Sequence, residues 1–148
     1  MQIMPETARY LLNRTGSGGN LDTIMRDPHA SVALGQQYIS YLQKQPAIGD
    51  NLIYLIASYN AGPSPLQKWK RELNHQNDPL LFVESIPFVE TRGYVLNVLT
   101  NYWIYSHLIG TNNPSVLAMV DGKWPLYQTS KQQIASITEN LTLRRNQN

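Results

Sequence analysis

The pattern of apolar positions predicts helices along most of this chain. The most apolar stretch, 51–61, runs Leu52-Ile53-Tyr54-Leu55-Ile56-Ala57 without a break. A helix without a polar face is buried at the centre of a domain. Asp50 is placed to cap its first turn, and Gly62-Pro63 follows as a stop signal. A buried strand is the alternative, but the cap and the stop favour a central helix.

The longest predicted helix covers residues 88–109. Apolar and aromatic residues recur in it at spacings of 3, 4, 3 and 4, namely Val95, Val98, Tyr102, Tyr105 and Ile109. This spacing puts them on one stripe of a helix. Gly110 follows and is expected to end the helix.

Prolines mark the starts of four further helices. Each can occupy the first helical position, where no backbone donor is lost, and two of the four follow an aspartate that can act as N-cap. The predicted ranges are Pro5–Asn13, Pro28–Gln45, Pro65–Asn74 and Pro79–Ser85, with another short helix at 115–119. No convincing pairs of β-strands are visible, so the sequence predicts an all-α fold.

Composition and charge exclude several classes of function. The chain has 148 residues, enough for one domain, and its net charge of +2 is too small for an electrostatic nucleic-acid binder. Its one basic cluster, Lys68, Lys70, Arg71 and His75, is interpreted as a solvated helix face. The longest apolar run, 52–57, is far shorter than the roughly 20 residues of a membrane span.

The residues also give no sign of a metal or cofactor. Cysteine is absent, which excludes disulfides and thiolate zinc sites. His29, His75 and His107 lack the i, i+4 or paired spacing of metal ligands. We therefore expect no cofactor.

Three blocks place polar groups among apolar residues, where they are costly unless paired or functional. They cover 1–5, 58–63 and 82–92. Structural alternatives exist for each block: Gln2 as a disordered terminal residue, Tyr59 as a core aromatic, Asn60 as a helix C-cap, and Glu84 as a cap of the next helix or a partner of Arg92. The residues by themselves predict a helical domain with a candidate polar cleft.

In this order, the three blocks resemble the signature motifs of the soluble lytic transglycosylase family, whose fold is that of goose-type lysozyme. Met-Gln-Ile-Met-Pro at 1–5 resembles the end of the family's Gly-Leu-Met-Gln-Ile-Met-Pro block. Ser-Tyr-Asn-Ala-Gly-Pro at 58–63 resembles its Ala-Tyr-Asn-Ala-Gly-Pro block. Glu-Ser-Ile-Pro-Phe at 84–88, continued by Glu-Thr-Arg-Gly-Tyr-Val at 90–95, resembles its third block.

The resemblance spans residues 1–110 and implies a domain of that extent, followed by a helical extension and polar tail at 111–148. It implies cleavage of the MurNAc–GlcNAc bond of peptidoglycan without water, which leaves 1,6-anhydroMurNAc ends. Gln2 and Met4 would line the glycan cleft, Tyr59 would lie over the scissile region, and Asn60 would support the cleft wall. Glu84 would help to position the substrate rather than donate the proton.

In this family one glutamate, in a Glu-Ser pair one helix before the Met-Gln block, is both acid and base. That position falls before Met1, so we expect no catalytic residue in this chain. We also expect a lysozyme-like fold that lacks its first catalytic helix. The chain by itself is then expected to have little or no activity. The same interpretation predicts a monomer that binds glycan strands and not nucleic acid. It also predicts a periplasmic or cell-envelope location, reached by an upstream signal peptide. A lysozyme-like hydrolase and a non-catalytic peptidoglycan-binding domain remain as alternatives.

Overall fold

The computed structural model describes residues 5–15, 21–111 and 113–128. The chain divides into two compact units, Met1–Pro46 and Ala47–Asn148. Among the described residues all regular elements are helices, and the one strand-like contact is an isolated antiparallel bridge between Asn51 and Leu126. The predicted all-α class is therefore confirmed.

The first unit contains the helices α1 (Pro5–Thr15), α2 (Leu21–Arg26) and α3 (Pro28–Gln43). Asp27 caps α3, as its carboxylate accepts the backbone N–H of His29 at 3.0 Å and Pro28 takes the first helical position. The buried residues Leu34, Tyr38 and Leu42 recur every four positions on one face of α3. The sequence did not predict α2, because six residues are too few for a helical period to show.

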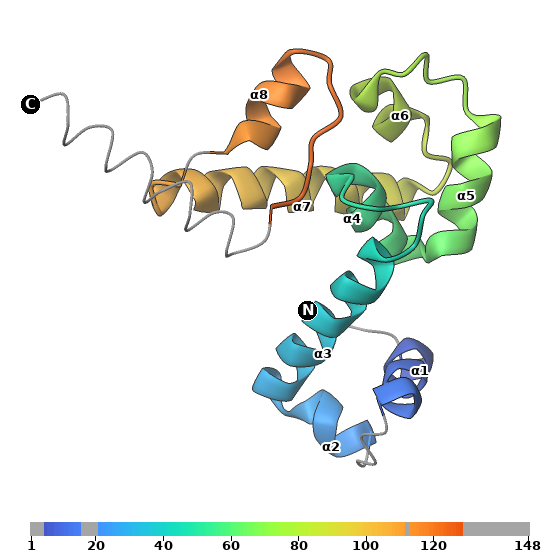
Figure 1. Cartoon of the computed structure of the whole chain (residues 1–148), viewed down its shortest axis with the longest axis vertical. Helices are drawn as coiled ribbons and strands as arrows, with labels where there is room; N and C mark the ends of the chain where they lie inside the picture. The colour runs from blue at the N-terminus through green and yellow to red at the C-terminus, as the bar shows by residue number, and fades with distance from the viewer. Residues whose placement is uncertain (1–4, 16–20, 112, 129–148) are drawn as a thin grey trace, which may run out of the picture. The chain divides into compact units, whose positions relative to one another are not determined.

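The second unit is built around α4 (Leu52–Ala61), whose residues 52–58 are all buried. Around it lie α5 (Pro63–Glu72), α6 (Pro79–Ser85), α7 (Val89–Leu108) and α8 (Pro114–Val120), and α4 packs most extensively on α7 (Figure 1). The prediction of a central buried helix is confirmed. The cap is not Asp50 but Asn51, whose side-chain oxygen accepts the backbone N–H of Tyr54 at 3.0 Å.

The predicted apolar stripe of α7 is correct only in its first half. Val95 is fully buried, but Tyr105 and Ile109 are 66% and 69% exposed. The buried line runs instead through Thr91, Val95 and Leu99 at intervals of four. The 20-residue α7 is about twice as long as the ten-residue α4. The first half of α7 is covered by α4, and the second half extends beyond it.

An aromatic cluster ties the segment after α8 to the centre of the second unit. The Phe82 ring meets Tyr54, His75 and Trp124 at centroid distances of 5.2, 5.3 and 5.7 Å. The Trp124 indole N–H donates to the side chain of Asn77 at 2.8 Å. The segment 111–128 therefore contributes to the core of the second unit, and the domain boundary predicted after residue 110 stays a prediction.

Lys70 and His75 do not belong to a solvated basic face, contrary to the sequence interpretation. The ammonium of Lys70 lies 4.3 Å from the centre of the Tyr54 ring and donates to the carbonyl of Ala47 at 2.6 Å. Burial lowers the pKa of Lys70. His75 packs edge-on against Phe82 and Trp124. Sequence periodicity missed both, because their partners come from distant parts of the chain.

Ser58 provides a test of packing at the buried end of α4. Its hydroxyl is fully buried and has no hydrogen-bond partner among the described residues. A buried unpaired polar group costs about 1–3 kcal/mol. We expect Ser58→Ala to raise the free energy of unfolding by about 1 kcal/mol, measured by urea denaturation.

Ser106 is the matched control for Ser58. It is also buried, at 5% exposure, but its hydroxyl donates to the carbonyl of Tyr102 at 2.8 Å. Ser106→Ala should therefore lower the free energy of unfolding by about 0.5–1 kcal/mol. If both substitutions changed the free energy of unfolding in the same direction, the result would contradict the proposal that, of the two hydroxyls, only that of Ser58 lacks a hydrogen bond within the described residues.

Candidate functional site

The second motif, 58–63, forms the junction between α4 and α5. Tyr59 and Asn60 lie in the last turn of α4, and Gly62 ends the helix with φ +87°, a conformation that residues with side chains rarely adopt. Pro63, not Pro65 as predicted, then begins α5. The glycine and proline thus fix the direction in which the chain leaves the candidate site.

Asn60 joins the second motif to the third. Its side-chain oxygen accepts the hydroxyl of Thr91 at 2.7 Å, and Thr91 is only 2% exposed in the first turn of α7. Asn60 is therefore not the C-cap of α4, a role that Gly62 takes. Thr91 was not among the predicted site residues, although its place between Glu90 and Arg92 in the third motif was the available signal.

Glu84 lies on the outer side of α6. The apolar neighbours Phe82, Val83 and Ile86 point into the core, while the Glu84 side chain is exposed. The apolar residues around Glu84 in the sequence do not bury its carboxylate, because positions 82, 83 and 86 share one helical face that excludes 84.

Neither predicted structural role of the Glu84 side chain is present. The N-cap of α7 is Phe88 rather than Glu84. The side chain of Arg92 does reach this residue, but it donates to the backbone carbonyl of Glu84 at 3.1 Å and not to the carboxylate. This bond fixes the turn between α6 and α7, and it leaves the Glu84 carboxylate on the surface.

Tyr59 is half-buried, and its hydroxyl oxygen is shielded from solvent. This position of the hydroxyl is compatible with both predictions for Tyr59, a residue in the wall of the site and a core aromatic. The first motif's residues Gln2 and Met4 lie outside the described residues. Of the five predicted site residues, the structure thus describes Tyr59, Asn60 and Glu84, all in the second unit.

The carboxylates of the described residues are all solvent-exposed. They are Glu6, Asp22, Asp27, Asp50, Glu72, Asp78, Glu84, Glu90 and Asp121. A glutamate that protonates a glycosidic oxygen near neutral pH needs an apolar pocket that favours its neutral form. None of these nine side chains is buried in such a pocket, because each is exposed to solvent.

Other kinds of site have little support in the part of the chain that the structure describes. There, no three histidine, aspartate or glutamate side chains come together as metal ligands would. None of the helices at 5–15, 21–111 and 113–128 has the length and apolar character needed to cross a membrane.

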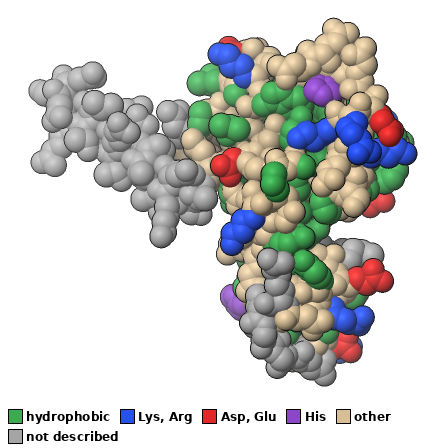
Figure 2. Space-filling model, turned by 45° about the vertical axis from the view of Figure 1, so that its right-hand side comes forward, with side chains coloured by type: hydrophobic (Ala, Val, Ile, Leu, Met, Phe, Trp, Pro, Cys, Tyr) green, Lys and Arg blue, Asp and Glu red, His purple; other side chains and the backbone are tan. Residues whose placement is uncertain are grey.

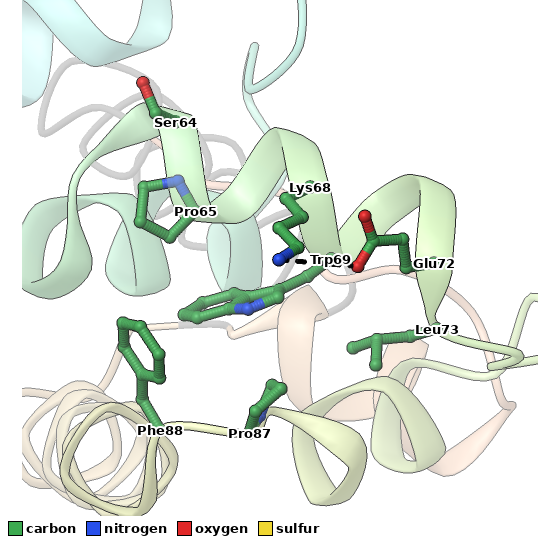
Figure 3. A pocket seen from close by; sticks show the side chains of 8 residues that line it. All are labelled: Ser64, Pro65, Lys68, Trp69, Glu72, Leu73, Pro87 and Phe88. Atoms are coloured by element: carbon green, nitrogen blue, oxygen red, sulfur yellow. Dashed lines mark ion pairs between the residues drawn. The ribbon is translucent and has the colours of Figure 1, made fainter.

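An open pocket lies beside the two motifs. It has a volume of about 410 Å³ and is enclosed by α5 and by the turn between α6 and α7 (Figure 3). The pocket begins at Ser64 and Pro65, directly after the second motif, and includes Pro87 and Phe88 of the third.

Comparison with known proteins identifies the family. A family model described as the transglycosylase SLT domain matches residues 1–82, and one described as the soluble lytic transglycosylase helical domain matches residues 85–114. The chain belongs to the SLT transglycosylase family. Glu84 falls between the two matched ranges of this SLT chain.

Named relatives of the SLT chain agree with this assignment. It is 36% identical over 122 residues to the soluble lytic murein transglycosylase of Escherichia coli K12, covering 82% of this chain and 18% of the relative. It is 37% identical over 130 residues to the protein of the same name from Salmonella typhimurium, covering 84% and 19%. The SLT chain thus spans about a fifth of the length of these relatives.

The fold of the SLT chain is similar to a solved structure. The crystal structure of the 70 kDa soluble lytic transglycosylase of E. coli matches with a TM-score of 0.68 and 39% identity, covering 74% of this chain and 18% of the other. The predicted lysozyme-like helical fold of the transglycosylases is therefore confirmed.

Proposed function

We propose that this SLT chain contributes the substrate-binding wall of a peptidoglycan lytic transglycosylase. The observation that carries the proposal is the hydrogen bond of 2.7 Å between Asn60 and Thr91, which joins two signature motifs far apart in the sequence. Its relatives, named soluble lytic murein transglycosylases, support murein as the substrate.

The proposed reaction breaks the bond between the anomeric carbon of MurNAc and the oxygen that links it to GlcNAc. A general acid protonates the leaving oxygen, and the same group, now a base, takes the proton of the C6 hydroxyl of MurNAc. The C6 oxygen attacks its own anomeric carbon and forms the 1,6-anhydro ring. Water is not consumed, which distinguishes this route from hydrolysis by two carboxylates.

Each candidate residue has a proposed role in this reaction. Tyr59 lies over the scissile bond, Asn60 holds the wall through Thr91, and Gln2 and Met4 line the glycan cleft. The exposed carboxylate of Glu84 is suited to accept hydrogen bonds from sugar hydroxyls, and so positions the substrate. The nine described carboxylates are exposed, which supports a general acid outside the described residues, as the family's Glu-Ser motif implies.

The proposed partner is the glycan strand, in the periplasm or elsewhere in the cell envelope. The mixed charges of the second unit argue against a nucleic acid as the partner. In Figure 2, the basic side chains gathered at the right of that unit have acidic side chains beside them, and elsewhere on the visible face the two signs are scattered. A nucleic-acid site would show a basic stripe.

The products of peptidoglycan digestion test this function. The 148-residue chain is expected to bind purified sacculi without releasing fragments. The same chain extended upstream by the predicted Glu-Ser helix is expected to release muropeptides with 1,6-anhydro ends, which are lighter by one water than reducing ends. Mass spectrometry of the soluble fraction distinguishes the two.

The two alternative functions predict other products from the extended chain. Reducing ends would identify a lysozyme-like hydrolase. Binding without release of any fragment would identify a non-catalytic peptidoglycan-binding domain. A chain that fails to bind sacculi at all would contradict all three functions.

A further inference from the structure

The pocket beside the two motifs has a preformed apolar interior. The Trp69 indole crosses it, with Pro65 on one side and Pro87 and Phe88 on the other (Figure 3). Trp69 is 4% exposed, and the half-exposed ring of Phe88 meets it edge-on at 5.2 Å. Proline and buried indole side chains change conformation little, so an aliphatic chain could enter without reorganisation.

The rim of this pocket carries one positive and one negative side chain. The ammonium of Lys68 lies 3.9 Å from the carboxylate of Glu72, one turn later on α5, and the two side chains are 63% and 55% exposed. An ion pair in water contributes only about 0–1 kcal/mol, so both groups can exchange this contact for one with a ligand. A complementary ligand would place a negative group near Lys68, a positive group near Glu72 and an apolar part in the pocket.

That ligand is an aliphatic chain that ends in an ammonium and a carboxylate on the same carbon. Lys68 would take the carboxylate, Glu72 the ammonium, and the pocket the methylene groups. Peptidoglycan contains this group where the peptide stem carries a diaminopimelate residue. The pocket adjoins Pro63 of the second motif and contains Phe88 of the third, so glycan and peptide could be held together.

We propose that the Lys68–Glu72 pocket binds the zwitterionic side-chain end of diaminopimelate in the peptide stem of peptidoglycan. This inference rests on the proposed function, because it takes murein as the substrate. It assigns the pocket to the peptide and leaves the sugar to Tyr59 and the wall that Asn60 holds in place. The pocket thereby distinguishes stems that end in a zwitterion from stems that end in an amine.

A titration followed by NMR tests the pocket with the full 148-residue chain. The probes are the stem tripeptide with diaminopimelate, the same tripeptide with lysine, which lacks the distal carboxylate, and a peptide-free GlcNAc–MurNAc disaccharide. We expect the diaminopimelate tripeptide to shift the indole resonance of Trp69 rather than those of Trp103 and Trp124. These two indoles donate to Ser115 and Asn77 away from the pocket.

Substitutions of Lys68 and Glu72 test the contribution of each charge to peptide binding. The lysine tripeptide should bind about three- to fivefold more weakly than the diaminopimelate tripeptide, the range of one exposed charge pair. Lys68→Met should remove this preference, and Glu72→Gln should weaken both peptides. Lys123→Met is the matched control, because Lys123 forms an exposed pair with Asp121 at 3.3 Å outside the pocket, and it should change neither affinity.

The outcomes also separate this inference from the proposed function. Equal affinity for the two tripeptides, or shifts away from Trp69, overturns the pocket assignment, even if the disaccharide binds and the proposed function stands. Selective binding of the diaminopimelate tripeptide supports the pocket even if the disaccharide does not bind, a result that would contradict the proposed glycan wall.

Discussion

Replacing Phe82 by alanine is expected to lower the free energy of unfolding of the second unit by about 3–5 kcal/mol, the usual cost of removing a buried phenylalanine ring. The Phe82 ring is 0% exposed and contacts Tyr54, His75 and Trp124. These residues belong to α4, the loop after α5, and the segment after α8. The cavity would loosen all three from α6, and against a typical domain stability of about 5–15 kcal/mol the loss is large.

The other phenylalanine of the chain is the matched control for Phe82. Phe88 is 52% exposed and meets Trp69 at the pocket wall. Because only about half of its surface is buried, Phe88→Ala should cost about 1 kcal/mol. Urea denaturation followed by circular dichroism measures both variants. A Phe82→Ala variant no less stable than Phe88→Ala would contradict the position of Phe82 at the centre of the aromatic cluster.

The second large effect is expected at the bond between Asn60 and Thr91. Asn60→Ala and Thr91→Val should each lower the free energy of unfolding by about 1–3 kcal/mol, because each leaves a partner without its part-buried hydrogen bond. The double variant should lose less than the sum, with a coupling of about 1 kcal/mol. Both single variants should also weaken binding to sacculi about tenfold, since the bond holds the two motifs in place.

The Thr91→Val variant tests whether Asn60 contacts the glycan directly or only holds the cleft wall in position. Thr91 is 2% exposed and cannot itself contact the glycan, so weaker binding in this variant must act through Asn60. Thr91→Ser keeps the hydroxyl and should restore most of the binding. Unchanged binding in Thr91→Val, together with weaker binding in Asn60→Ala, would show that Asn60 contacts the sugar directly and that the bond to Thr91 does not position it.

Local signals were sufficient to predict most helices, because the physics that sets their ends is local. Aspartate before proline marks the first turn of α3 and of α6, and glycine before proline marks the end of α4. The error at the start of α4 was also local. Asp50 and Asn51 are both good N-caps, and only the backbone conformation decides that Asn51 accepts the bond from Tyr54.

The sequence predicted which motifs form the candidate site but not how their side chains are oriented. The order of motifs is visible in a sequence, whereas the direction of a side chain is not. The sequence contained the second and third motifs, but it did not reveal that Asn60 and Thr91, 31 residues apart, form a hydrogen bond. It also placed Glu84 within an apolar run, without showing which way its side chain points. An apolar run on a helix buries one face only, and Glu84 lies on the other.

The sequence by itself determined the all-α class, the central helix predicted at 51–61, the candidate residues Tyr59 and Asn60, and the resemblance to the SLT transglycosylases. These follow from helix periods, caps and motifs, which are local properties of the chain. Only the tertiary structure decided which half of α7 is buried, that Lys70 and His75 pack on aromatic rings, and that Lys68 and Glu72 stand above an apolar pocket. Each of these depends on contacts between segments distant in sequence, because burial is set by the neighbours that folding brings together.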